Sequence, residues 1–109
     1  MPDLDPVIHQ PARLKVMAVL CRLGPREQAD FTSLRAELAL TDGNLGAHLL
    51  TLERAGYIAV EKAFVARKPK TSVAITAAGR RAFGGHVAAL KAILRPDGGR
   101  RHLKTLSAS

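Results

Sequence analysis

The stretch LRAELALTDGNLGAHLLTLERAGYI, residues 34–58, contains two short amphipathic segments in close succession. The first has two leucines four residues apart, a spacing that places them on one face of a helix. The second has a leucine stripe at positions i, i+4 and i+7, formed by Leu45, Leu49 and Leu52. Only residues 39–41 separate the segments, so we predict two helices joined by a tight turn.

The second predicted helix has clear start and stop signals. Thr41 can cap it, because its hydroxyl accepts a hydrogen bond from a free amide of the first turn. Asp42 follows, where the helix dipole favours a carboxylate. Gly56 can adopt the left-handed conformation that ends a helix after Ala55. The pattern therefore predicts a helix-turn-helix.

The outer face of this second helix begins with very small residues. At about 100° per residue, it contains Gly43, Gly46, Ala47, Leu50 and Arg54, opposite the leucine stripe. Small residues let a helix backbone approach another surface closely, and a DNA major groove about 12 Å wide accepts a helix. The alternative is that the two glycines merely weaken a surface helix.

Length and composition indicate one domain with a modest core. The chain has 109 residues, of which 47% are apolar, and no apolar run approaches the ~20 residues of a membrane span. The N-terminus MPDLDP lacks the basic region of a signal peptide, so we expect a cytoplasmic protein with no membrane partner. The single cysteine, Cys21, is expected to be a buried structural thiol. The scattered histidines predict no metal site.

Positive charge is concentrated in the C-terminal part of the chain. Residues 1–61 carry six basic and eight acidic residues, whereas residues 62–109 carry eleven basic residues and one acidic residue. This segregation indicates a polyanionic partner such as nucleic acid, or less strongly an anionic membrane surface. A merely solubilising charged face remains the alternative.

Further helices are predicted on both sides of the helix-turn-helix. Residues 4–9 suit a short helical turn capped by Asp5, and a longer helix extends from Pro11 to about Leu23. Either Thr32 or Ser33 can cap the helix that opens the helix-turn-helix.

After Gly56 the pattern changes to strands. Residues 57–65 and 71–76 predict a β-hairpin whose tip is residues 67–70, and Thr76 caps a last helix that begins at Ala77. The predicted fold class is mostly helical α+β. We expect a domain at residues 1–95 and a basic, disordered tail at residues 96–109.

A set of residues along the chain matches the pattern of one protein family. They are Leu40–Leu45, His48-Leu49, Leu52-Glu53, Ala55–Tyr57, Phe64, Arg67, Pro69, Thr71, Thr76, Gly79-Arg80 and Phe83, preceded by Leu4-Asp5, Ile8-His9, Pro11 and Arg13-Leu14. Over residues 4–95 the chain resembles the small winged helix-turn-helix transcriptional regulators of the MarR/ArsR-like group. The resemblance implies a homodimeric regulator that binds double-stranded DNA, with its recognition helix in the major groove and its wing on the backbone or in the minor groove.

The resemblance also implies the residues that contact DNA. They are Thr41, Asp42, Gly43, Asn44, Gly46, Ala47, His48, Thr51, Arg54, Arg67, Lys68 and Lys70. Such regulators usually have basic residues where this chain has Leu50 and Thr51. We therefore expect the wing to supply much of the affinity, with modest specificity and steep salt dependence.

The last predicted helix carries an apolar stripe close to a heptad seam. Together with the N-terminal arm, it is expected to form the dimer interface, composed of Val7, Ile8, Phe83, Val87, Leu90 and Leu94. Part of so long an apolar face should remain for a second copy of a small domain.

Some assignments stay open at this point. His48 either faces DNA or is a structural histidine, and Arg80 and Arg81 either contact phosphate or pair with Glu53 or Glu61. The sequence has no nucleophile elbow, phosphate-binding loop or carboxylate dyad, so we predict neither an enzyme nor a cofactor. A winged-helix protein-interaction module with only non-specific DNA affinity is the alternative function. No effector site is predicted.

Overall fold

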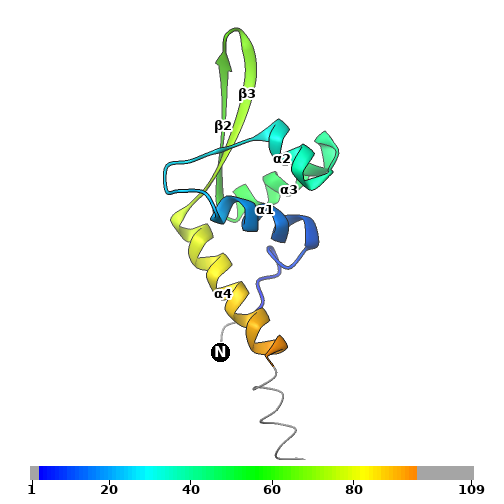
Figure 1. Cartoon of the computed structure of the whole chain (residues 1–109), viewed down its shortest axis with the longest axis vertical. Coiled ribbons are helices and arrows are strands. Elements are labelled where there is room, and N and C mark those ends of the chain that lie inside the picture. Colours follow the sequence, from blue (N-terminus) through cyan, green and yellow to red (C-terminus); the bar gives the residue numbers. More distant parts are fainter. Residues whose placement is uncertain (1–2, 96–109) are drawn as a thin grey trace, which may run out of the picture.

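The computed structural model describes residues 3–95, so the predicted tail at 96–109 lies outside the described residues. The elements are α1 (Pro11–Cys21), β1 (Ala29–Asp30), α2 (Phe31–Leu38), α3 (Asp42–Arg54), β2 (Ile58–Val65), β3 (Lys68–Ile75) and α4 (Ala77–Leu94). The first three helices form a compact body; the β2–β3 hairpin projects from one end of it and α4 from the other (Figure 1). The predicted mostly helical α+β fold with a hairpin wing is confirmed.

The predicted helix caps are mostly confirmed. The Thr41 hydroxyl accepts from the Asn44 amide at 3.1 Å, and Gly56 has a φ of 82° just after α3. The prediction for α2 was wrong: Asp30, rather than Thr32 or Ser33, is its N-cap and accepts from the Ser33 amide at 3.1 Å. A carboxylate at this position satisfies a free amide and also suits the helix dipole.

The sheet has three strands in the order β1-β3-β2, all antiparallel. Residues 29–30 form β1, which the sequence pattern does not predict, and they pair with Val73 and Ser72 of β3. The hairpin turn is also tighter than predicted. It consists of Ala66 and Arg67, with φ of 51° and 66°, and β3 begins at once with Lys68.

The core lies between the helical body and the base of the hairpin. The Leu45, Leu49 and Leu52 stripe of α3 is buried, as predicted. The core cluster consists of Ile8, Val16, Met17, Leu20, Leu34, Leu45, Leu49, Leu52, Ile58 and Val73. The prediction that Ile8 belongs to the dimer interface was wrong, because this side chain is 0% exposed within the core of its own chain. Cys21 is only half-buried.

Three residues at the start of α4, namely Thr76, Gly79 and Arg80, fix this helix against the helical body. The Thr76 hydroxyl accepts from the Gly79 amide at 2.9 Å and donates to the Gly56 carbonyl at 2.7 Å. A Cβ on Gly79 would lie 2.0 Å from the Tyr57 carbonyl oxygen, so only glycine fits there. Arg80 donates to the carbonyls of Cys21 and Leu23 at 3.1 and 2.8 Å, at and beyond the C-terminal end of α1.

These contacts settle one of the open assignments. Arg80 neither faces phosphate nor pairs with Glu53 or Glu61, since its guanidinium is bonded to the carbonyls at the end of α1. Arg81 is exposed. None of the helices described between residues 3 and 95 is long and apolar enough to span a bilayer.

Candidate nucleic-acid interface

The outer face of α3 is accessible to solvent and begins with residues that have small or no side chains. A Cβ added to Gly43 or Gly46 would meet no atom within 4 Å, so packing within the chain does not require glycine at either position. Leu50 is 44% exposed, Ala47 and Arg54 are also exposed, and Gly46 is half-buried. Most of the helix residues predicted to contact DNA therefore share one accessible surface. The Thr51 hydroxyl donates back to the Ala47 carbonyl at 3.2 Å.

The N-terminal end of α3 carries a charge pair that the sequence pattern did not predict. Arg35, in the last turn of α2, donates to the Asp42 carboxylate at 2.6 Å. The Asp42 side chain is 71% exposed and that of Arg35 is 38% exposed. Arg35 therefore offsets a negative charge that would otherwise repel phosphate at the predicted contact surface.

His48 lies at the edge of this surface and faces α1. Its Nδ1 is 3.2 Å from the Arg13 guanidinium, and Arg13 Nε donates to the Val7 carbonyl at 2.6 Å. Burial first, and then the positive charge of Arg13, lower the pKa of His48 below its ordinary value. A neutral ring whose Nδ1 accepts from Arg13 fits this arrangement. His48 is thus a link between α3 and the N-terminal arm.

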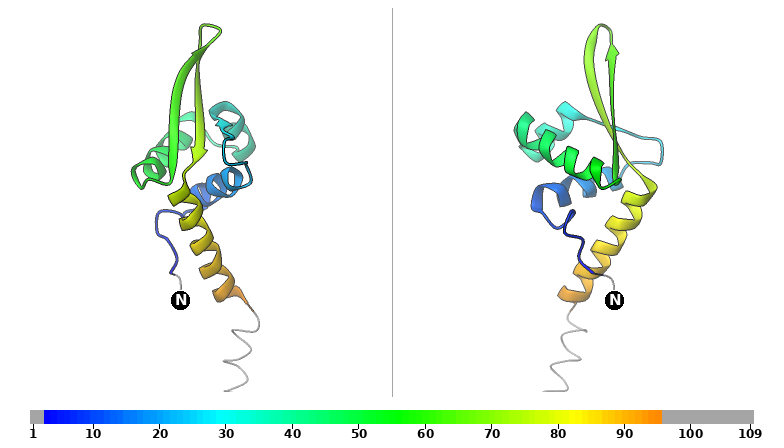
Figure 2. Two further views of the ribbon diagram at one scale, coloured as in Figure 1. Left: turned by 90° about the vertical axis from the view of Figure 1, so that its left-hand side faces the viewer. Right: turned by 180° about the vertical axis from the view of Figure 1, so that it is seen from behind.

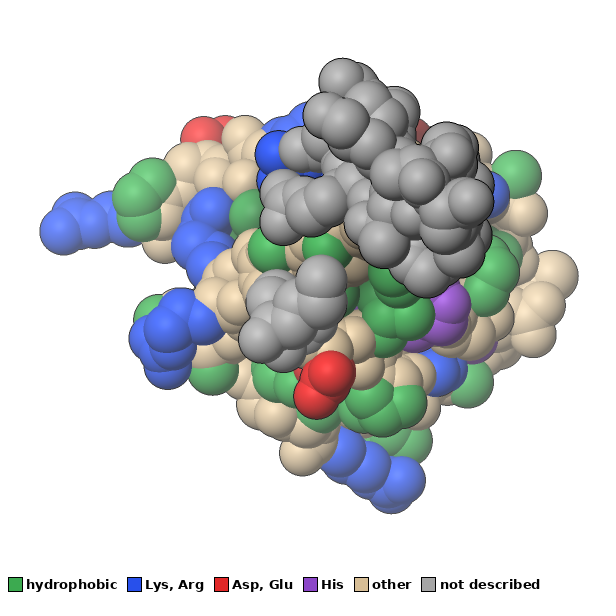
Figure 3. Space-filling view, turned by 90° about the horizontal axis from the view of Figure 1, so that it is seen from below, with side chains coloured by type: hydrophobic (Ala, Val, Ile, Leu, Met, Phe, Trp, Pro, Cys, Tyr) green, Lys and Arg blue, Asp and Glu red, His purple; other side chains and the backbone are tan. Residues whose placement is uncertain are grey.

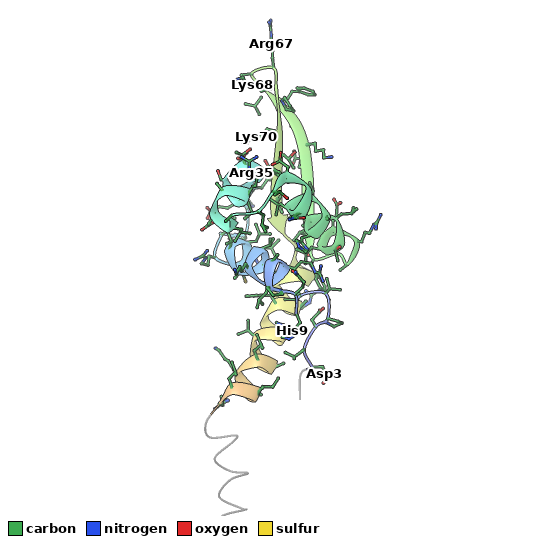
Figure 4. The ribbon with its side chains drawn as sticks, turned by 90° about the vertical axis from the view of Figure 1, so that its right-hand side faces the viewer. Asp3, His9, Arg35, Arg67, Lys68 and Lys70 are labelled. Carbon is green, nitrogen blue, oxygen red and sulfur yellow. The ribbon has the colours of Figure 1, made fainter. Side chains whose placement is uncertain are left out.

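The hairpin bears its positive charges on two faces. Figure 4 shows Arg67 at the tip, with Lys68 and then Lys70 below it. The antiparallel register pairs Lys62 with Thr71, on the face that continues from the Val60–Val73 pair. Lys68 and Lys70 occupy alternate positions and so project from the opposite face. Lys62 was not among the predicted contacts, although it is exposed within the same basic segment.

A groove joins α3 to the hairpin. It has a volume of about 420 Å³, and α3 lines it with Gly46, Leu49, Leu50 and Glu53. Val60, Lys62 and Thr71 of the strands form the other wall, together with Phe31. The outer part of α3 and the groove-facing side of the hairpin therefore open on a common space. Figure 2 shows the hairpin rising beside α3 in both views.

Two histidines that are far apart in sequence meet beside the N-terminal arm. His9 Nδ1 lies 3.4 Å from His86 Nε2, and His86 Nδ1 accepts from the Asp5 amide at 2.9 Å. The Tyr57 hydroxyl donates to the Asp5 carboxylate, which raises the pKa of Tyr57. His86 is 1% exposed, and burial lowers its pKa, with His9 contributing. Within residues 3–95, no cluster of three potential metal ligands is found.

The remaining residues of the predicted dimer interface differ in accessibility. Val7 and Phe83 are half-buried against the chain's own core, and Val87 and Leu90 are also half-buried. Leu94 is 74% exposed at the end of α4. Ile93, which was not predicted, is 65% exposed beside it. Seen from below, this end of the molecule has hydrophobic side chains between projecting Lys and Arg side chains (Figure 3).

Three helices, a short third strand, a two-stranded wing and a final helix define a winged helix-turn-helix protein. Residues 12–94 match the family model of the winged helix DNA-binding domain, and the chain belongs to this family. The predicted winged-helix DNA-binding domain is thereby confirmed.

Known proteins with this architecture include archaeal and bacterial ones. An uncharacterized protein of Methanocaldococcus jannaschii is 36% identical over 81 residues, which cover 74% of this chain and 85% of that protein. The structure of a transcriptional regulator homologue from Pyrococcus horikoshii is 35% identical, with a TM-score of 0.72 over 81% of this chain and 84% of that one. The MepR–DNA complex of S. aureus is 12% identical, with a TM-score of 0.65 over 94% and 81% of the two chains.

Proposed function

We propose that this protein is a transcriptional regulator that binds double-stranded DNA as a homodimer. One observation carries the proposal: the glycine-containing outer side of α3 and the basic hairpin line the same groove. In this arrangement, α3 enters the major groove and the hairpin follows the backbone or enters the minor groove. The similarity to a regulator homologue and to the DNA-bound MepR structure supports this function.

The hairpin supplies most of the electrostatic attraction in this proposal. Arg54 is the cation that α3 itself provides, and the neighbouring Arg35 is engaged by Asp42. The hairpin adds four cations within residues 62–70 and no carboxylate. If each of the four neutralises one phosphate, they contribute about −3.6 per chain to the slope of log K against log salt.

A second copy of the chain is the proposed occupant of the exposed end of α4. The half-buried Val87 and Leu90 lead to the exposed Ile93 and Leu94, so an apolar strip continues beyond the domain's own core. Pairing of two such strips about a two-fold axis would remove them from water. The two recognition helices would then address half-sites about one helical turn apart, roughly 34 Å.

Titration of random-sequence duplex DNA by fluorescence anisotropy, at a series of salt concentrations, tests the DNA-binding proposal. We expect micromolar or tighter binding at low salt, with a steep loss of affinity as salt rises. Lys70→Ala should reduce the slope by about 0.9 per chain, or about 1.8 for the dimer, because one phosphate per chain is no longer neutralised. Lys15→Ala, at an exposed position of α1 outside both proposed interfaces, is the matched control and should leave the slope unchanged. Absence of binding at micromolar protein would favour the alternative of a protein-interaction module, for which the exposed Leu50 is the candidate contact.

Sedimentation equilibrium tests the dimer separately. The wild type should sediment as a dimer at tens of micromolar, and a double substitution of Ile93→Asp and Leu94→Asp should yield monomers that remain folded, because both side chains are already exposed. A wild-type monomer at this concentration would contradict the dimer proposal.

A further inference from the structure

One aromatic residue stands far outside the core. Phe64, near the end of β2, is 78% exposed, whereas Phe31, Tyr57 and Phe83 all pack against the core cluster. It lies four residues beyond Val60, or about 13 Å further along the strand at ~3.3 Å per residue. Most of its ring is therefore open to solvent. An exposed aromatic ring at the end of a projecting hairpin is a candidate contact for another molecule.

The strand register gives Phe64 a rigid and directed position. It pairs with Pro69 across the hairpin, immediately next to the Val65–Lys68 pair that flanks the two-residue turn. The alternation of an antiparallel ladder makes the Phe64–Pro69 pair the type in which cross-strand side chains lie closest. Proline also fits there because that position requires no N–H donor within the ladder.

The same register places the aromatic ring on the groove side of the hairpin. Residues Val60, Lys62 and Phe64 alternate along one face of β2, and Val60 and Lys62 line the groove shared with α3. Val65 lies on the opposite face and is also exposed, at 54%. Phe64 therefore extends the surface that begins at Gly46, whereas Val65 points away from it.

The charged residues near Phe64 indicate what kind of molecule it contacts. The segment from Lys62 to Lys70 has four cations and no carboxylate, so every charged residue at this end of the hairpin is a cation: Lys62 is on the same face as Phe64, Arg67 is in the turn, and Lys68 and Lys70 are on the opposite face. An apolar side chain framed by cations suits the minor groove of DNA, where phosphates line both edges and apolar wedges partially unstack base steps. A groove about 6 Å wide and 7.5 Å deep can accept the tip of a two-stranded hairpin only if it widens.

We propose that Phe64, supported by Pro69, is an apolar wedge that the hairpin inserts into the minor groove, where it unstacks a base step and bends the duplex. This inference rests on the proposed DNA-binding function and adds a source of specificity. A wedge favours sequences that deform at low cost, such as pyrimidine–purine steps. The wedge would then let the protein discriminate between sequences, although the glycine-containing outer face of α3 offers few groups for direct base reading.

The experiment separates the wedge from electrostatic attraction. Anisotropy titrations at several salt concentrations would use a duplex of about 30 base pairs containing TA steps, with a fluorophore pair at its ends to report bending. Phe64→Ala should weaken binding about tenfold without changing the salt slope, and should reduce bending. Val65→Ala is the matched control: an exposed apolar residue on the opposite face, which should change neither property.

Two further variants sharpen the test. Phe64→Lys adds a cation, so it should steepen the salt slope while still failing to bend DNA. Phe64→Leu keeps an apolar wedge and should retain much of the bending. Equal affinity and bending in the wild type and Phe64→Ala would overturn the wedge but leave DNA binding intact. Failure of the wild type to bind any duplex would instead overturn the proposed function itself.

Discussion

Replacing Gly46 by alanine is expected to stabilise the free protein and at the same time weaken its binding to DNA. Gly46 lies inside α3, and a Cβ there meets nothing within 4 Å. The substitution therefore gains the helix propensity of alanine, about 0.5–1 kcal/mol, without a steric cost. For a domain of this size, each kcal/mol raises Tm by roughly 4–8 °C.

The effect on DNA binding has the opposite sign. An added methyl group on a surface that lies close to DNA must push the two apart or displace neighbouring side chains, and overpacking of this kind costs roughly 1–3 kcal/mol. About tenfold weaker binding is therefore expected. Gly84→Ala is the matched control, because Gly84 lies inside α4 and also has open space around it.

Thermal unfolding and anisotropy titration of both variants measure the two effects. Gly46→Ala and Gly84→Ala should raise Tm by similar amounts, but only Gly46→Ala should lose DNA affinity. If the two variants bind DNA equally well, the reasoning about close approach of α3 is refuted. If Gly46→Ala lowers Tm, the conclusion that a Cβ at this position meets no other atom is wrong.

Three other substitutions test the framework that holds α3 and the hairpin in place. Gly79→Ala should lower the free energy of unfolding by more than about 2 kcal/mol, since its Cβ would collide with the Tyr57 carbonyl; a loss below about 0.5 kcal/mol in urea titration would contradict this. Arg80→Ala should cost about 2 kcal/mol in the same assay, because it removes charged hydrogen bonds to carbonyls at the end of α1, whereas Arg81→Ala at an exposed position should cost almost nothing. Burial and the nearby His9 lower the pKa of His86 below 6.5, although Asp5 opposes the shift. On acidification, His86 therefore takes up a proton at a higher pH in the unfolded chain than in the folded one. The free energy of unfolding should fall as the pH drops below about 6.5, by at most about 1.4 kcal/mol per pH unit, until the pH reaches the folded-state pKa. His86→Gln should flatten that dependence, and an unchanged pH profile would argue against a neutral, buried ring.

The features predicted correctly from the sequence depend on local interactions. Thr41 and Thr76 act as caps through bonds to amides three residues away, and the α3 leucine stripe follows from helical periodicity alone. The hairpin was evident from the change of period after Gly56. Such features need only neighbouring residues, so one sequence is enough to find them.

The features that were missed depend on contacts between distant segments. The strand β1 exists because two residues pair with β3, at positions 72 and 73, and the turn at Ala66-Arg67 takes positive φ angles without glycine or asparagine. Periodicity carries no information on either. The strand alternation that separates Lys62 from Lys68 also requires the exact register.

The predictions of site residues likewise divide into those that depend on local patterns and those that depend on contacts between distant segments. The small residues on the outer side of α3 were recognised from the helical wheel. In contrast, Ile8 was assigned to the dimer surface because an apolar arm can be buried either by its own core or by a partner, and the sequence does not distinguish the two. The bonds from Arg80 to α1 and from His86 to Asp5 span 57 to 81 positions, so they became visible only in the structure.

The central claim is that α3 and the hairpin contact one duplex from the same side. Amide NMR spectra of isotope-labelled protein, recorded during addition of duplex DNA, test it most directly. We predict that signals from residues 43–51 and 62–70 shift together at the same DNA concentration, while those of the buried residues of α1 stay in place. Shifts confined to the hairpin, with the signals of α3 unchanged, would contradict the claim.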